Sequence, residues 1–277
     1  MADEPPRSRA ARDAAEQALV SVVHHYGETP EFVLIGGLVP ALLCSESPLL
    51  HAGTTDIDVQ VNLDIAAGSV NATRLEEALI KANFEPERQN VWRWRTQDDT
   101  QRTAVKFELL ADLKNQPAES VVSFDDCEAL GAINLRGSGF ATRDYTPCSL
   151  KSRAEAIDFV VQVNVTGLAG FLFAKTAAAH RRRKEKDWYD IAFVLLHSDA
   201  GGPEQAATVT RERFGGELTG EIRTALDDLL ANFAAPGAQG PTAYASQMVI
   251  DQPDTPETQL RADAVLAVKT FHSQLFS

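Results

Sequence analysis

Cysteine is scarce in this chain. Cys44, Cys127 and Cys148 are its only three among 277 residues, and they lie far apart. This spacing predicts neither a disulfide framework nor a cysteine metal site, and it is typical of a reducing compartment. No apolar run approaches the ~18 residues that a membrane-spanning helix needs, and the N-terminal residues are polar rather than those of a secretory signal. We therefore expect a cytoplasmic protein without a membrane segment.

Positive charge is also in deficit. The chain has 26 Lys and Arg against 39 Asp and Glu, a net charge of −13, which argues against broad electrostatic binding to nucleic acid. The basic residues are unevenly spread, because six of them lie between Lys175 and Lys186 with only Glu185 opposing them. A local basic cluster on an acidic chain fits a phosphate-bearing ligand better than an extended nucleic-acid track.

The pattern along the chain predicts an α+β protein of two domains. Strand-like segments dominate the first half, whereas helical periodicity dominates after Gly167. We expect a core domain over 1–160 and a helical domain over 161–277 that completes a ligand-binding cleft with it. The segment Ala234–Asp254 is rich in Pro, Gly and small residues and is predicted to be a loop. Among the other predicted elements are strands at Phe32–Ile35, Asp56–Leu63, Val91–Arg95 and Thr103–Leu110, and helices at Glu204–Phe214, Glu217–Phe233 and Gln259–Leu275.

The most informative stretch is FVLIGG followed, after a helix-like segment and a polar loop, by TTDIDVQV. Asp56 and Asp58 alternate with Ile57 and Val59, so a strand would carry both carboxylates on one face. Two neighbouring carboxylates repel each other unless a positive charge lies between them. Oxygen-only ligation favours Mg²⁺ or Mn²⁺. The alternative is a pair of acidic residues at a solvent-facing strand end.

Gly36 and Gly37 close the preceding apolar run. Backbone without side chains can approach a phosphate closely and direct its N–H groups toward it. We therefore include Gly36 and Gly37, with Thr55 beside the first aspartate, among the candidate nucleotide-binding residues.

A third carboxylate is expected from a neighbouring strand. In AVKFELLAD, Lys106, Glu108 and Leu110 share one face, and Glu108 would be costly there without a cation. Glu108 is the better candidate and Asp112 the second. The alternative is that Glu108 pairs with Arg93 or Arg95 across a hairpin.

A second candidate cluster lies in FLFAKTAAAHRRRKEKDWYDIAFVLL. If this were one helix, 100° per residue would place a row of charges within roughly 80° of arc. Lys175 is surrounded by apolar and small residues, so it needs an anionic partner. For Arg181, Arg183 and Lys184 a solvated helix surface is the preferred interpretation. The row consists of Lys175, Arg182, Lys186 and Asp190.

The order of glycine turn, short helix and Asp-x-Asp strand resembles the nucleotidyltransferase fold of the DNA polymerase beta-like enzymes. An isolated Asp-x-Asp also occurs in glycosyltransferases. The lysine, the arginine and the later K-D-x-Y-D-I resemble the AbiEii/AbiGii group, known mostly as toxins of toxin–antitoxin pairs. The resemblance implies transfer of a nucleoside monophosphate from an NTP to an acceptor such as RNA or tRNA, and a cognate antitoxin as partner.

The resemblance also implies roles for individual residues. Asp56 and Asp58 would hold metal, with Glu108 assisting. Lys175 and Arg182 would contact the nucleotide's phosphates. Asp190 would complete the site, with Asp187 as the competing candidate for that role.

Two further functions remain open. A silent nucleotide-binding module is suggested by Glu108, where the family more often has aspartate, and by Ala52 and Gly53, where members often carry an arginine. Transfer to a small molecule such as a cationic antibiotic would suit the acidic composition. P-loop, G-x-S-x-G and CxxC motifs are absent from the sequence.

Overall fold

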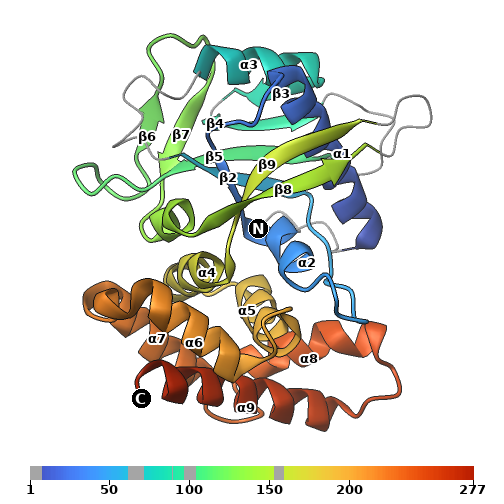
Figure 1. Ribbon diagram of the computed structural model, residues 1–277, viewed down its shortest axis with the longest axis vertical. Helices are drawn as coiled ribbons and strands as arrows, with labels where there is room; N and C mark the ends of the chain where they lie inside the picture. The colour runs from blue at the N-terminus through green and yellow to red at the C-terminus, as the bar shows by residue number, and fades with distance from the viewer. Residues whose placement is uncertain (1–7, 62–71, 89, 97–103, 153–158) are drawn as a thin grey trace. The chain divides into compact units, whose positions relative to one another are not determined.

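The computed structural model describes residues 8–61, 72–88, 90–96, 104–152 and 159–277 (Figure 1). The chain divides into two compact units, Met1–Val39 with Ala52–Thr166, and Pro40–His51 with Gly167–Ser277. The first unit contains the sheet and the second is helical. The predicted α+β class, a mixed sheet with helices followed by a mostly helical part, is confirmed.

In the described part of the first unit, nine strands form one mixed sheet. The strand order is β3-β4-β5-β2-β1-β9-β8, and β7 pairs with both β5 and β6. The β2–β5, β1–β9 and β5–β7 pairs are parallel, and the rest are antiparallel. The strands are β1 (Val33–Ile35), β2 (Asp56–Gln60), β3 (Phe84–Glu87), β4 (Asn90–Thr96), β5 (Lys106–Ala111), β6 (Val121–Ser123), β7 (Gly131–Asn134), β8 (Tyr145–Lys151) and β9 (Val160–Thr166).

One face of the sheet packs into the main hydrophobic core of this unit. Ile57, Phe107 and Trp94 lie side by side on β2, β5 and β4 and are almost completely buried. Helix α1 (Arg9–Tyr26) packs on α3 (Ala72–Lys81), and both contact strands of the sheet. The residues that alternate with Ile57 on β2 and with Phe107 on β5 point to the other face, as the strand period predicts.

The other face has an apolar part and a charged part. Val33, Ile35 and Leu110 pack with Ala141 of the short helix η2 (Ser138–Arg143), and Ile133 and Leu135 lie against them. On β5 and its neighbours β2 and β4, this face carries acidic and basic side chains. Strand β5 therefore contributes both to the apolar cluster and to the charged part of the face.

Most predicted elements of this unit are confirmed, with shifted ends. The β4–β5 antiparallel pair is the predicted hairpin, although its connection, together with residues 62, 63 and 103 of the predicted strands, lies outside the described residues. The helix behind the glycines is present as η1 (Gly36–Leu38) and α2 (Val39–Leu43). Sequence patterns did not indicate β3, β6 or β8, which lie at sheet edges and lack a clear apolar alternation.

The second unit is a bundle of helices (Figure 1). Where a loop was predicted over Ala234–Asp254, a helix covers most of the segment, so that prediction is wrong. A Cβ at Gly240 would overlap the Phe233 ring, which makes glycine there a packing requirement, and Pro241 lies in the first turn, where its missing N–H costs no helix bond. The helices are α4 (Leu168–Arg182), α5 (Glu185–His197), α6 (Pro203–Phe214), η3 (Gly215–Glu217), α7 (Gly220–Asn232), α8 (Gln239–Asp251) and α9 (Glu257–Leu275).

The division between the units differs from the predicted boundary after residue 160. That position falls inside β9, which belongs to the sheet because it pairs with both β1 and β8. The segment Pro40–His51 belongs to the helical unit, where Asp199 accepts hydrogen bonds from the backbone N–H groups of Ser45 and Glu46. Within the described residues, none of the helices combines the length and apolarity required to cross a membrane.

Candidate functional site

The carboxylate of Asp58 lies directly against the backbone of Gly36. Ile35 and Asp58 are partners in the β1–β2 register, so the turn that follows β1 begins beside this side chain. Gly36 has φ +75°, and a Cβ at this position would overlap Oδ2 of Asp58. Only glycine satisfies both requirements. The structure thus brings one predicted metal ligand onto the predicted phosphate-binding turn.

Gly37 and the residues before Asp56 form the other side of this turn. A Cβ at Gly37 would lie 2.9 Å from Cβ of Thr54, and the Thr54 hydroxyl accepts a hydrogen bond from the Asp56 N–H at 3.1 Å. Thr55 is buried, and its carbonyl accepts from the Lys106 N–H. Small side chains and backbone bonds therefore fix where β2 begins.

Replacing Gly36 by alanine tests this contact. We expect Gly36→Ala to lower the free energy of unfolding by about 2 kcal/mol or more, because a non-glycine residue is strained in the left-handed region and its Cβ would displace Asp58. Urea unfolding measures the effect. Gly216→Ala is the matched control, since a Cβ there would meet nothing within 4 Å. Equal stability of the two variants would contradict the contact.

Two rows of charged residues cross the sheet beside the turn. In one, Asp56 is the register partner of Lys106, with 3.5 Å between Oδ1 and Nζ. In the other, Glu108 lies between Asp58 on β2 and Arg93 on β4, and Nε of Arg93 donates to Oε1 of Glu108 at 2.6 Å. Pairing of Glu108 across the hairpin, which the sequence left open, is thus present.

Competing effects determine the pKa of the Glu108 carboxyl group. Burial raises its pKa, Asp58 raises it further and Arg93 lowers it, giving a value of about 7. The second candidate for a third carboxylate, Asp112, is occupied elsewhere: its Oδ2 accepts from the N–H groups of Gly137 and Gly139. Asp112 therefore holds the backbone at the start of η2.

The carboxylates of Asp56 and Asp58 are suited to holding a divalent ion. Among the described residues, no group of three or more His, Cys, Asp and Glu is arranged to hold a metal ion. Asp56 and Asp58 nevertheless offer oxygen donors on one face of one strand, and Mg²⁺ is commonly bound by one or two carboxylates together with substrate phosphates. The predicted role of Glu108 as third ligand is not tested by this geometry, in which its carboxylate pairs with Arg93.

In the second unit, Lys175 has two buried acidic partners. Its Nζ lies 2.8 Å from Oδ2 of Asp190 and 3.2 Å from Oδ1 of Asp187. Lys175 is 6% exposed, and both aspartates are 0% exposed. Arg182 donates to both oxygens of Asp187 at 2.6 and 2.7 Å. The anionic partner expected for Lys175 is therefore supplied by α5, by both candidates for the later aspartate.

His51 completes this buried ion network and was missed from the sequence. Its Nε2 lies 2.9 Å from Oδ1 of Asp190, and its fully buried ring packs on Tyr189 and Phe193. Burial alone would raise the pKa of Asp187, but Lys175 and Arg182 together lower it below its usual value. A single histidine in a polar loop gives no periodic signal, so local sequence patterns could not have placed it.

The single helix assumed for the charge row does not form. Helix α4 ends at Arg182, Arg183 adopts φ 48°, and α5 begins at Glu185. Arg182 pairs with Asp187 across this break, and Asp228 binds Arg183 at 2.9 Å. No glycine or proline marks the position, which is why the pattern did not predict it. The neighbouring Arg181, Arg183 and Lys184 are exposed, in accord with a solvated surface.

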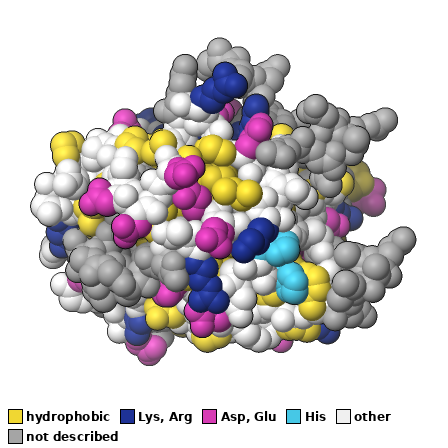
Figure 2. All heavy atoms as spheres, turned by 90° about the horizontal axis from the view of Figure 1, so that it is seen from above, with side chains coloured by type: hydrophobic (Ala, Val, Ile, Leu, Met, Phe, Trp, Pro, Cys, Tyr) yellow, Lys and Arg dark blue, Asp and Glu magenta, His cyan; other side chains and the backbone are white. Residues whose placement is uncertain are grey.

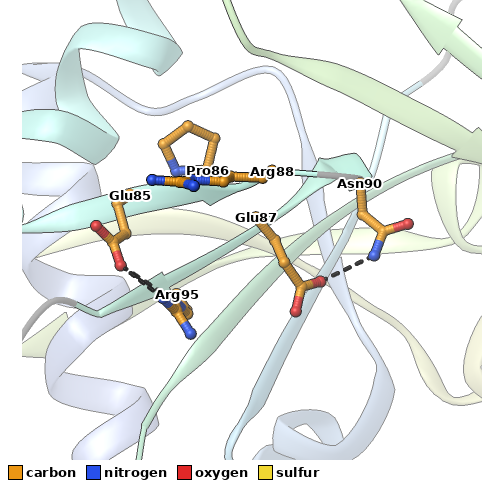
Figure 3. A pocket seen from close by; sticks show the side chains of 6 residues that line it. All are labelled: Glu85, Pro86, Glu87, Arg88, Asn90 and Arg95. Atoms are coloured by element: carbon orange, nitrogen blue, oxygen red, sulfur yellow. Dashed lines mark hydrogen bonds and ion pairs between the residues drawn. The ribbon is translucent and has the colours of Figure 1, made fainter.

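Charges of both signs are interspersed with apolar side chains on the face seen in Figure 2. A shallow concavity of about 410 Å³ lies at the β3–β4 hairpin (Figure 3). In it Arg95 pairs with Glu85, and the Asn90 amide donates to Glu87. The predicted site residues are not among its lining residues, which are Glu85, Pro86, Glu87, Arg88, Asn90 and Arg95.

Comparison with protein-family models and with curated proteins gives no match. Among solved structures, the chain is similar to the CdnE cyclic dinucleotide synthase of Elizabethkingia meningoseptica, in a structure with GTP and Apcpp. The sequence identity is 12%, the TM-score is 0.28, and the match covers 96% of this chain and 92% of that one. A TM-score this low carries no functional inference, so the function proposed below rests on this chain's own residues.

Proposed function

We propose that this chain is a metal-dependent nucleotidyltransferase, which moves a nucleoside monophosphate from an NTP to an acceptor. The observation that carries the proposal is the Asp58 carboxylate resting on the bare backbone of Gly36, with Asp56 on the same strand face. This arrangement places anionic oxygens and backbone N–H groups at one turn. Such a turn suits a ligand that combines a divalent cation with phosphate groups.

The proposed roles follow from the chemistry of each group. Asp56 and Asp58 would hold Mg²⁺ or Mn²⁺, and Gly36 and Gly37 would direct backbone N–H groups to a phosphate. When bound, the ion supplies positive charge that offsets the triphosphate and the charge developing during transfer. Lys106 beside Asp56 adds a cation that can orient a phosphate oxygen.

Phosphate contact by Lys175 and Arg182 remains part of the proposal, with Asp190 supporting the acceptor. Because both cations bind Asp187 and Lys175 also binds Asp190, they would have to share their charge between these aspartates and a phosphate.

Incubating the purified full-length chain with each α-labelled NTP, Mg²⁺ and an acceptor panel tests the proposal. The panel contains total RNA, protein and antibiotics. We expect label to enter one acceptor class and EDTA to abolish the transfer. If a protein that circular dichroism shows to be folded transfers label from none of the NTPs to any acceptor class, the proposal is overturned.

The finer proposal is an RNA or tRNA acceptor and a toxin role with a cognate antitoxin, which the AbiEii/AbiGii resemblance supports. Growth arrest on expression, relieved by a small neighbouring gene, would support it.

A silent nucleotide-binding module is the second candidate, favoured by the engagement of Glu108 with Arg93. It predicts NTP binding without labelled product.

A further inference from the structure

We propose that Arg93 sets the metal affinity of the Asp56–Asp58 site by holding Glu108 as its own ion-pair partner, so that a divalent ion enters together with a nucleotide. This rests on the proposed function for the identity of the site. It adds a residue, Arg93, that the sequence indicated only as one of two possible hairpin partners.

The position of Glu108 gives its side chain two possible partners. Glu108 is in register with Asp58 on one side and with Arg93 on the other, and neighbouring strands lie about 4.8 Å apart. A carboxylate there can reach toward a cation shared with Asp58 or toward Arg93. In the structure it lies on Arg93, with a short Nε–Oε1 distance of 2.6 Å.

Arg93 is itself held in place. Glu87 lies 3.5 Å from its Nη1, and its guanidinium lies over the Trp92 ring, 4.4 Å from the centroid. The Arg93 and Glu108 side chains are 28% and 15% exposed. A charge-assisted hydrogen bond of this length in a partly shielded position is stronger than an exposed surface pair, so the contact competes effectively for Glu108.

The consequence is a site with a low negative charge. Asp56 has Lys106 beside it and Glu108 has Arg93, so two of these carboxylates already have a cationic partner. Divalent-ion affinity depends on the number of charged ligands. Two carboxylates, one of them next to a lysine, bind a free ion weakly, whereas an ion that already carries triphosphate oxygens needs few protein ligands.

Arg95 offers a matched control on the same strand and face. It pairs with Glu85 at the sheet edge, where the two side chains are 57% and 40% exposed (Figure 3). It is the register partner of Lys106, not of Glu108. Substitution of Arg95 removes the same charge without releasing a carboxylate next to Asp58.

Titration of the full-length chain with Mn²⁺, followed by electron paramagnetic resonance without nucleotide, tests the proposal. We expect Arg93→Met to bind Mn²⁺ at least about tenfold more tightly than the parent, a change of the size that second-sphere residues produce. The double variant Arg93→Met/Glu108→Gln should return to the parent's affinity, and Arg95→Met should match the parent. With NTP present, parent and Arg93→Met should converge.

Two results would overturn the proposal. One is a folded Arg93→Met variant whose Mn²⁺ affinity is unchanged or lower. The other is a loss of about tenfold in Glu108→Gln alone, which would make Glu108 a direct ligand. If the parent transfers nucleotide while either result is obtained, only the role of Arg93 fails. If Arg93→Met tightens Mn²⁺ binding but neither the parent nor any variant transfers nucleotide, the proposed function fails and the role of Arg93 stands.

Discussion

Asp58→Asn should lower nucleotide transfer by at least about a hundredfold. Removing a residue that only supports a metal ligand costs up to about a hundredfold, and Asp58 is proposed to be a ligand itself. The substitution keeps the shape of the side chain against Gly36 but removes the charge that would bind a divalent ion. Transfer of label from an α-labelled NTP, at saturating Mg²⁺, measures the loss.

Stability separates this effect from misfolding. We expect the free energy of unfolding of Asp58→Asn to stay within ~1–2 kcal/mol of the parent, because the carboxylate also repels Glu108. Asp125→Asn is the matched control, an exposed aspartate of the same unit, and should keep full activity. Parent-like transfer by Asp58→Asn would remove this residue from the mechanism.

The largest expected effect on stability follows from the buried ion network of the helical unit. Lys175→Met should lower the free energy of unfolding by about 3–5 kcal/mol, the usual cost of breaking a buried ion pair by removing one partner. Asp187 would keep Arg182, but Asp190 would keep only His51 among the contacts described above. Urea unfolding followed by circular dichroism measures the change.

Two comparisons make the result specific. Lys269→Met changes the same residue type on the exposed side of α9 and should be within about 0.5 kcal/mol of the parent. Adding Asp190→Asn to Lys175→Met should restore part of the stability, because it removes the uncompensated charge. A Lys175→Met variant as stable as Lys269→Met would show that the lysine does not hold the two aspartates together.

Local sequence patterns predicted the parts of the fold that depend on local periodicity. The alternation of Asp56, Ile57 and Asp58 indicated which side chains share a face of β2, and the same reasoning assigned Lys106 and Glu108 to one face of β5. The glycine pair after an apolar strand was recognisable because few other residues suit such a turn. These features require only the strand period and the conformational freedom of glycine.

Features that depend on tertiary contacts could not be predicted in this way. The break at Arg183 has no glycine or proline, and contacts of Arg182 and Arg183 with Asp187 and Asp228 accompany it. Helix α8 forms in a segment of loop-like composition, and its Gly240 packs closely against the Phe233 ring. The pairing of Glu108 with Arg93 was likewise open until the register of β4 and β5 was known.

The most direct test of the central claim is nucleotide binding by the full-length chain as a function of Mn²⁺, compared between the parent and Asp56→Asn/Asp58→Asn. Two carboxylates beside a glycine turn predict that the parent binds NTP more tightly as Mn²⁺ is added, and that the double variant shows no such dependence. Identical Mn²⁺-dependent binding in both proteins would contradict the account, because the ion would then be held by other residues.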